Sequence, residues 1–172
     1  MQSPTDEELD LPQTDSQQTC GRPDCVCALP VNERFILWAL RQWRSELSGW
    51  REGRTLPPEG SALLRGFQLA GLLDVLPAFA NLMDALLFGA RRALEIHDPA
   101  CSCLGGDEAT LIALCALAQL DRDGPLLVTL DAMMVPAASP AAAMRLKTFA
   151  VELAEAGLRL SPPGGAAAAQ LH

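Results

Sequence analysis

Five of the six cysteines lie in two short segments rich in Pro, Gly, Asp and Ser: Cys20, Cys25, Cys27, Cys101 and Cys103. A cysteine that serves as a small apolar filler is expected on a core face, and only the sixth, Cys115, lies in such an apolar run. The other five thiols therefore suggest metal binding or redox chemistry, as is usual for cysteines in a reducing compartment.

Two C-x-C pairs, one from each segment, provide four sulfur ligands. A zinc ion accepts four thiolates in a tetrahedral arrangement, with zinc–sulfur distances of about 2.3 Å. We therefore expect a zinc site formed by Cys25, Cys27, Cys101 and Cys103. The same four thiolates suit an iron–sulfur cluster, which is the alternative cofactor. Two further residues offer substitute ligands, Cys20 and His97.

Two other readings of the cysteines stay open. One is a thiol–disulfide switch, in which an oxidant joins two vicinal thiols. It stays open because a C-x-C pair must hold a metal ion in a tighter chelate than a C-x2-C pair does. The other is a helical interaction subunit that binds no metal and whose thiols have no chemical role. Enzymatic activity is less favoured, because the chain has two histidines and no nucleophile-elbow motif. We assign no catalytic residue and expect His97 to cap carbonyl groups at a helix end.

The remaining charged residues have structural explanations. Asp107 stands where a helix cap is expected, and Glu108 follows it as a first-turn partner of the helix dipole. A spaced series of arginines predicts a solvated helix face, since acidic residues interrupt it: Arg34, Arg41, Arg44, Arg51 and Arg54.

Net charge and hydropathy exclude two classes of partner. The chain carries a net charge of −8, and residues 1–30 hold six acidic residues against one arginine. Without a basic cluster, neither nucleic acid nor an anionic membrane surface is expected as a partner. The beginning of the chain lacks the features of a secretory signal, and the clean apolar run 109–120 is too short for a bilayer span. We expect a cytoplasmic protein, bacterial in its preference for arginine over lysine, that binds another protein in an unknown oligomeric state.

Apolar residues recur at three- and four-residue steps along most of the chain, which predicts an all-α fold, a compact bundle of five to six helices. Caps, glycines and prolines delimit them. The expected segments are 32–49, 60–75, 77–95, 107–120, 126–135 as a short helix or a brief strand, and 139–157. The fourth is apolar on every side and is expected to be central.

These elements make one domain. Residues 20–160 are expected to form a single helical domain that includes the cysteine-rich lead-in. Residues 1–19 combine acids, Pro, Ser, Thr and Gln and are expected to be a disordered acidic segment. Residues 161–172 are expected to be a flexible tail.

Overall fold

A computed structural model describes residues 25–51 and 60–162, and these fold into six α-helices without a β-strand. The all-α prediction is therefore confirmed. The segment 1–19, the substitute ligand Cys20 and most of the predicted tail lie outside the described residues. The helices are α1 (Val31–Arg51), α2 (Ala62–Leu69), α3 (Leu76–Gly89), α4 (Gly106–Gln119), α5 (Asp123–Met133) and α6 (Ser139–Glu155), with short 3-10 turns η1 (Val26–Ala28) and η3 (Leu73–Val75).

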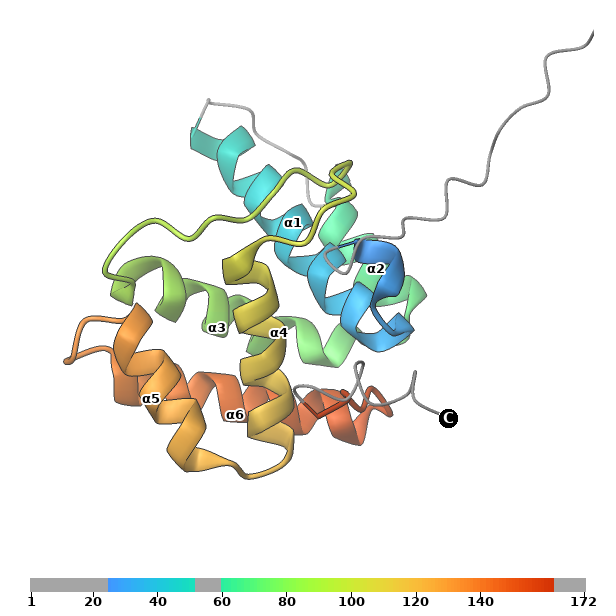
Figure 1. Ribbon diagram of the computed structural model, residues 1–172. Coiled ribbons are helices and arrows are strands. Elements are labelled where there is room, and N and C mark those ends of the chain that lie inside the picture. The colour runs from blue at the N-terminus through green and yellow to red at the C-terminus, as the bar shows by residue number, and fades with distance from the viewer. Residues whose placement is uncertain (1–24, 52–59, 163–172) are drawn as a thin grey trace, which may run out of the picture.

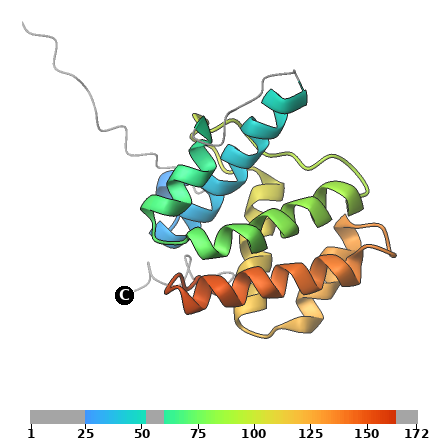
Figure 2. The same ribbon diagram turned by 180° about the vertical axis from the view of Figure 1, so that it is seen from behind.

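The helices pack around α4 and α6. Helix α6 packs against α3, α4 and α5, while α1 packs against α2 and α4. Figure 1 shows α4 in the middle of the molecule, and Figure 2 shows α3 and α6 side by side on the opposite face. Helix α4 is buried on several sides, through Leu111, Leu114, Cys115 and Ala118 among others. Its predicted central position is confirmed.

A row of phenylalanine rings connects the two halves of the core. Phe67 of α2 contacts Phe35 of α1 and Phe79 of α3, with ring centroids 5.2 and 5.5 Å apart. Phe79 in turn contacts Phe149 of α6 at 5.5 Å. Since such edge and tilted ring pairs add to the energy of burial, this row fixes α1 and α2 on the α3–α6 layer.

The third helix is shorter than its periodicity predicts. It ends at Gly89 rather than near residue 95, because the chain leaves the helix to pair with the segment after α5. Ala90 and Met134 form an antiparallel bridge, and the Val135 N–H donates to the Gly89 carbonyl at 2.8 Å. A Cβ at Gly89 would lie 2.6 Å from the Met134 side chain, so this close approach requires a glycine.

Three other boundaries differ from expectation. The second helix ends at Leu69, since Gly71 adopts φ +71°, and η3 follows it. The segment 126–135, expected as a short helix or a brief strand, falls in helix α5, which begins earlier, at Asp123, and ends at Met133. Ser139, expected as a helix cap, instead donates a hydrogen bond from its hydroxyl to Asp131 at 2.6 Å.

The beginning of the predicted tail is attached to α1. The Ser161 N–H donates to the buried carboxylate of Glu33 at 2.8 Å, and Asn32 donates to the Arg159 carbonyl at 2.7 Å. The first residue of the predicted tail, Ser161, is therefore held against α1 by a hydrogen bond. None of the helices in the described ranges has the length and hydropathy of a membrane span.

Candidate functional site

The structure brings the two cysteine segments together at the level of the backbone. Cys25 and Cys103 form an isolated antiparallel β-bridge, and the Val26 N–H donates to the Ser102 carbonyl at 3.0 Å. In Figure 1, the chain between α3 and α4 crosses α1 before it descends into α4. The segment that precedes α1 therefore lies directly beside the second C-x-C pair.

The thiols differ in burial and in their nearest partners. Cys25 is buried and Cys27 is exposed, and their sulfur atoms lie 2.7 Å apart. Cys101 is half-buried, and its sulfur lies 3.7 Å from Nδ1 of His97. Cys103 is exposed. Each pair therefore places a thiol at the surface beside one that is less accessible.

The side chains do not form a complete ligand sphere. Within residues 25–51 and 60–162, no three His, Cys, Asp or Glu side chains are grouped closely enough to hold a metal ion. The structure thus juxtaposes the two segments, while the ligand set Cys25, Cys27, Cys101 and Cys103 stays a prediction. His97, expected to cap a helix end, instead contacts the Cys103 carbonyl in the loop, at 3.3 Å from Nδ1.

A buried ion pair lies beneath the second cysteine pair. Arg41 of α1 binds Glu108 of α4 through two hydrogen bonds, Nε to Oε1 and an Nη to Oε2, both 2.8 Å. The Arg41 side chain is 3% exposed and that of Glu108 is fully buried. The prediction that Arg41 belongs to a solvated face is therefore wrong, because a carboxylate from another helix compensates its charge in the core.

The same ion pair holds the cysteine loop by its backbone. The guanidinium of Arg41 donates to the carbonyl groups of Cys101 and Cys103, at 2.5 and 2.6 Å. Glu108 accepts hydrogen bonds from the N–H groups of His97 and Gly105, at 2.9 and 2.8 Å. Since these two side chains bind four backbone groups between residues 97 and 105, they fix the conformation of the loop from its buried side.

The charges of the pair stabilise each other. The hydrogen bond to Glu108 raises the pKa of Arg41 against the effect of desolvation, and the negative charge of Glu108 adds to the rise. Burial tends to raise the pKa of Glu108, but the hydrogen bonds from Arg41 and from the two N–H groups outweigh it and lower the pKa. Both side chains are therefore ionised at neutral pH.

A second ion pair holds the chain before the loop. Arg92 binds both carboxylate oxygens of Asp107, at 2.7 and 2.8 Å, and Asp107 also accepts the Glu95 N–H at 2.8 Å. These bonds lower the pKa of Asp107, with Arg92 as the largest cause. The prediction that Asp107 is the helix cap is wrong, since Gly105 occupies that position and the Asp107 carboxylate turns toward Arg92 instead.

The spacing of Arg41 in the sequence carries a signal of its burial. Arg41 stands four residues after Leu37, about one helical turn, so it lies on the same buried face of α1. A charge on a core face indicates a compensating partner elsewhere in the chain. The prediction for Cys115 is confirmed, because it is 3% exposed and burial raises the pKa of its thiol to about 12.

Comparison with known proteins adds no relative. The chain matches no protein-family model, no curated protein and no solved structure.

Proposed function

We propose that this protein is a metal-binding regulatory module, in which one zinc ion joins the two C-x-C pairs and the helical surface binds a partner protein. An iron–sulfur cluster is the alternative occupant. The observation that carries the proposal is the antiparallel bridge between Cys25 and Cys103. It brings together two segments that are far apart in the chain and that each carry two soft ligands.

The burial pattern supports this ligand set. Cys27 and Cys103 are exposed, so their side chains can rotate toward a common centre without displacing core residues. Cys101 already lies beside His97, which can replace a thiolate as a ligand, as can Cys20. Because four hydrogen bonds from the Arg41–Glu108 pair hold the loop backbone, little backbone ordering remains for the metal to impose.

A buried guanidinium lies beneath the proposed thiolate-rich centre. A zinc ion with four thiolates has a net charge of about −2, which a nearby cation stabilises. The guanidinium of Arg41 binds the carbonyl groups of both Cys101 and Cys103 and is buried beneath them. Because Glu108 already compensates the charge of Arg41, the guanidinium supports the site through its hydrogen bonds to these two carbonyl groups.

One observation favours a second candidate, a thiol–disulfide switch. The sulfur atoms of Cys25 and Cys27 lie 2.7 Å apart. A hydroperoxide would oxidise these two thiols to one disulfide and be reduced to water and an alcohol, with both thiol protons transferred to its oxygens. This switch requires no metal, which separates it from the first candidate.

Metal content tests the proposal. Protein purified anaerobically without a histidine tag is expected to retain about one equivalent of zinc, and less than ~0.2 equivalents of zinc or iron contradicts it. Cys101→Ser is expected to lower zinc affinity by about tenfold or more. Cys115→Ser is the matched control, because Cys115 lies in the core, and should keep the metal.

Thiol counting separates the two candidates. Bound metal protects its four thiolates from a thiol reagent until a chelator is added. A disulfide switch instead loses two reactive thiols after peroxide treatment and recovers them with a reductant, with no response to the chelator.

A further inference from the structure

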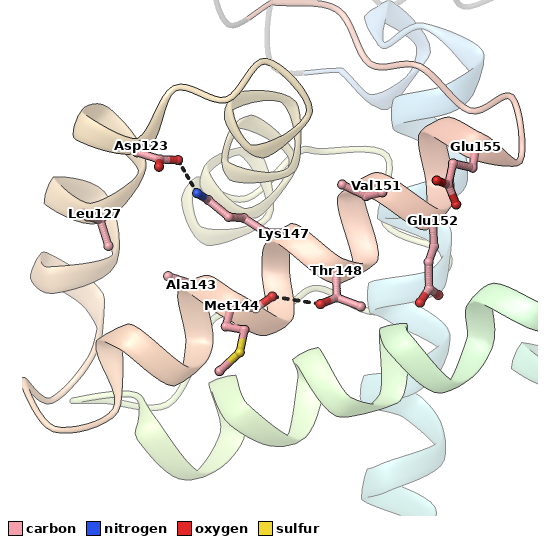
Figure 3. A pocket seen from close by; sticks show the side chains of 9 residues that line it. All are labelled: Asp123, Leu127, Ala143, Met144, Lys147, Thr148, Val151, Glu152 and Glu155. Atoms are coloured by element: carbon pink, nitrogen blue, oxygen red, sulfur yellow. Dashed lines mark hydrogen bonds and ion pairs between the residues drawn. The ribbon is translucent and has the colours of Figure 1, made fainter.

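An apolar groove runs between α5 and α6, away from the cysteine segments. It has a volume of about 690 Å³. Figure 3 shows Leu127 on α5 facing a row of side chains along α6, which includes Met144 and Val151. Lys147 and Asp123 join the two helices at one side of the groove, with 2.5 Å between Nζ and Oδ1.

Helix α6 has a second apolar face besides the one in the core. Its core face carries Leu146, Phe149 and Leu153, each at most 1% exposed. Met144 and Val151 are 64% and 48% exposed, and their seven-residue spacing puts them on one face two turns apart. With Leu127 they form a row of exposed apolar side chains, which is a signature of an interaction site.

The polar side chains of the groove differ in whether the structure gives them a bonding partner. The Thr148 hydroxyl donates to the Met144 carbonyl, 3.1 Å away in the preceding turn, so it needs no external partner. Lys147 is paired with Asp123. Glu152 and Glu155 form no ion pair with any residue in the described part of the chain. Both carboxylates lie in the last turn of α6, where the helix dipole is already negative.

We propose that this groove binds an amphipathic helix of a partner protein, with its apolar stripe on Leu127, Met144 and Val151 and with Lys or Arg beside Glu152 and Glu155. The stretch of α6 from Ala143 to Glu155 spans about 18 Å, so it accommodates a helix of about three turns. This binding mode, an apolar face in a groove with charged flanks, is a general one for helical peptides.

Charge disfavours the two ends of this chain and a second copy as occupants. Residues 1–24 carry six acidic residues and one arginine, so they would be repelled by Glu152 and Glu155. Residues 163–172 contain no Lys or Arg. A second copy of the chain, with a net charge of −8, brings the same sign of charge. A basic helix from another protein is the complementary partner.

A displayed library of helical peptides tests the proposal on the full-length protein. The peptides have apolar residues at i, i+3, i+4 and i+7, while the other positions vary among Lys, Glu, Gln and Ala. Selection uses the wild-type chain, after depletion on a Val151→Glu variant. We expect the enriched peptides to carry Lys at one end, and their binding to be measured by fluorescence anisotropy.

Matched variants define the result. Val151→Glu is expected to weaken binding of the enriched peptide by about tenfold or more. Replacing both Glu152 and Glu155 by Gln is expected to weaken it by about three- to tenfold and to reduce its salt dependence. Arg145→Gln, an exposed change on α6 outside the groove, should leave binding unchanged. Circular dichroism confirms that each variant is folded.

Several outcomes would overturn the proposal. These are the absence of any peptide enriched over the Val151→Glu chain, enrichment of acidic or uncharged peptides, and binding insensitive to the two Gln replacements. A wild-type dimer that Val151→Glu dissociates would assign the groove to a second copy. Because the groove residues are not among the proposed metal ligands, metal content should stay the same in every variant, so this proposal fails or holds independently of the metal site.

Discussion

Replacing Arg41 by methionine removes the guanidinium and keeps a side chain of similar length in the core. The fully buried carboxylate of Glu108 loses its cation, and the carbonyl groups of Cys101 and Cys103 lose their donors. Breaking a buried ion pair from one side costs about 3–5 kcal/mol. Since a domain is stabilised by about 5–15 kcal/mol, this single change would remove a large share of its stability.

Urea unfolding followed by far-ultraviolet circular dichroism measures the loss. With a denaturant dependence of about 2 kcal/mol per M, the midpoint should fall by about 2 M. Arg44→Met is the control on the same helix, because Arg44 is exposed and donates a hydrogen bond to Ser48 within α1. It should change stability by less than ~0.5 kcal/mol.

A double variant separates loss of the pair from loss of packing. Adding Glu108→Leu to Arg41→Met removes the stranded carboxylate, so the double variant should be at least ~2 kcal/mol more stable than the sum of the two single losses predicts. A loss below ~1 kcal/mol for Arg41→Met alone would refute the claim that this ion pair holds the cysteine loop.

Three further predictions follow from buried groups. The pKa of Glu108 in the folded protein lies below its ordinary value of 4.5, and that of Asp107 lies below 3.8. Both ionised carboxylates therefore stabilise the fold above these pH values, and this stability is lost as they are protonated. The urea midpoint should fall as pH drops from about 5 to 3, and it should fall less steeply in Glu108→Gln. In the metal-free protein, a maleimide or disulfide reagent should modify the exposed thiols of the C-x-C pairs while the chain is folded. It should reach the buried Cys115, whose thiol has a pKa of about 12, only on unfolding. Mass spectrometry of timed samples measures the two rates, and equal rates would contradict this prediction. Gly66→Ala should lower stability by about 1–3 kcal/mol in the same urea assay, because the new Cβ would lie 1.8 Å from the Trp38 ring, and an unchanged midpoint would show that the ring moves freely.

Local pattern was sufficient for most of the helices. Apolar spacing predicted the helix over 32–49, in which Ile36 and Leu40 are buried, and predicted that the helix over 107–120 is central. It failed where a distant segment decides the structure. Nothing near Gly89 in sequence shows that α3 ends there, because the cause is its pairing with the chain around Met134.

The candidate site, like the fold, could be predicted from the sequence only in part. Residue type and spacing identified the two cysteine pairs, and the structure places Cys25 beside Cys103. The supporting ion pair was not predicted, because Arg41 and Glu108 are 67 residues apart and each has a local explanation, Arg41 on a solvated helix face and Glu108 as a partner of the helix dipole. A buried charge becomes recognisable only when its partner is known, and that depends on how α1 and α4 pack.

X-ray absorption spectroscopy at the zinc edge, on the zinc-loaded full-length chain, tests the central claim most directly. Ligation by Cys25, Cys27, Cys101 and Cys103 predicts four sulfur neighbours at about 2.3 Å, or three with one nitrogen at about 2.0–2.1 Å if His97 substitutes for a thiolate. A first shell made mostly of oxygen and nitrogen, or a chain that retains no zinc to measure, would contradict a metal centre that joins the two cysteine pairs.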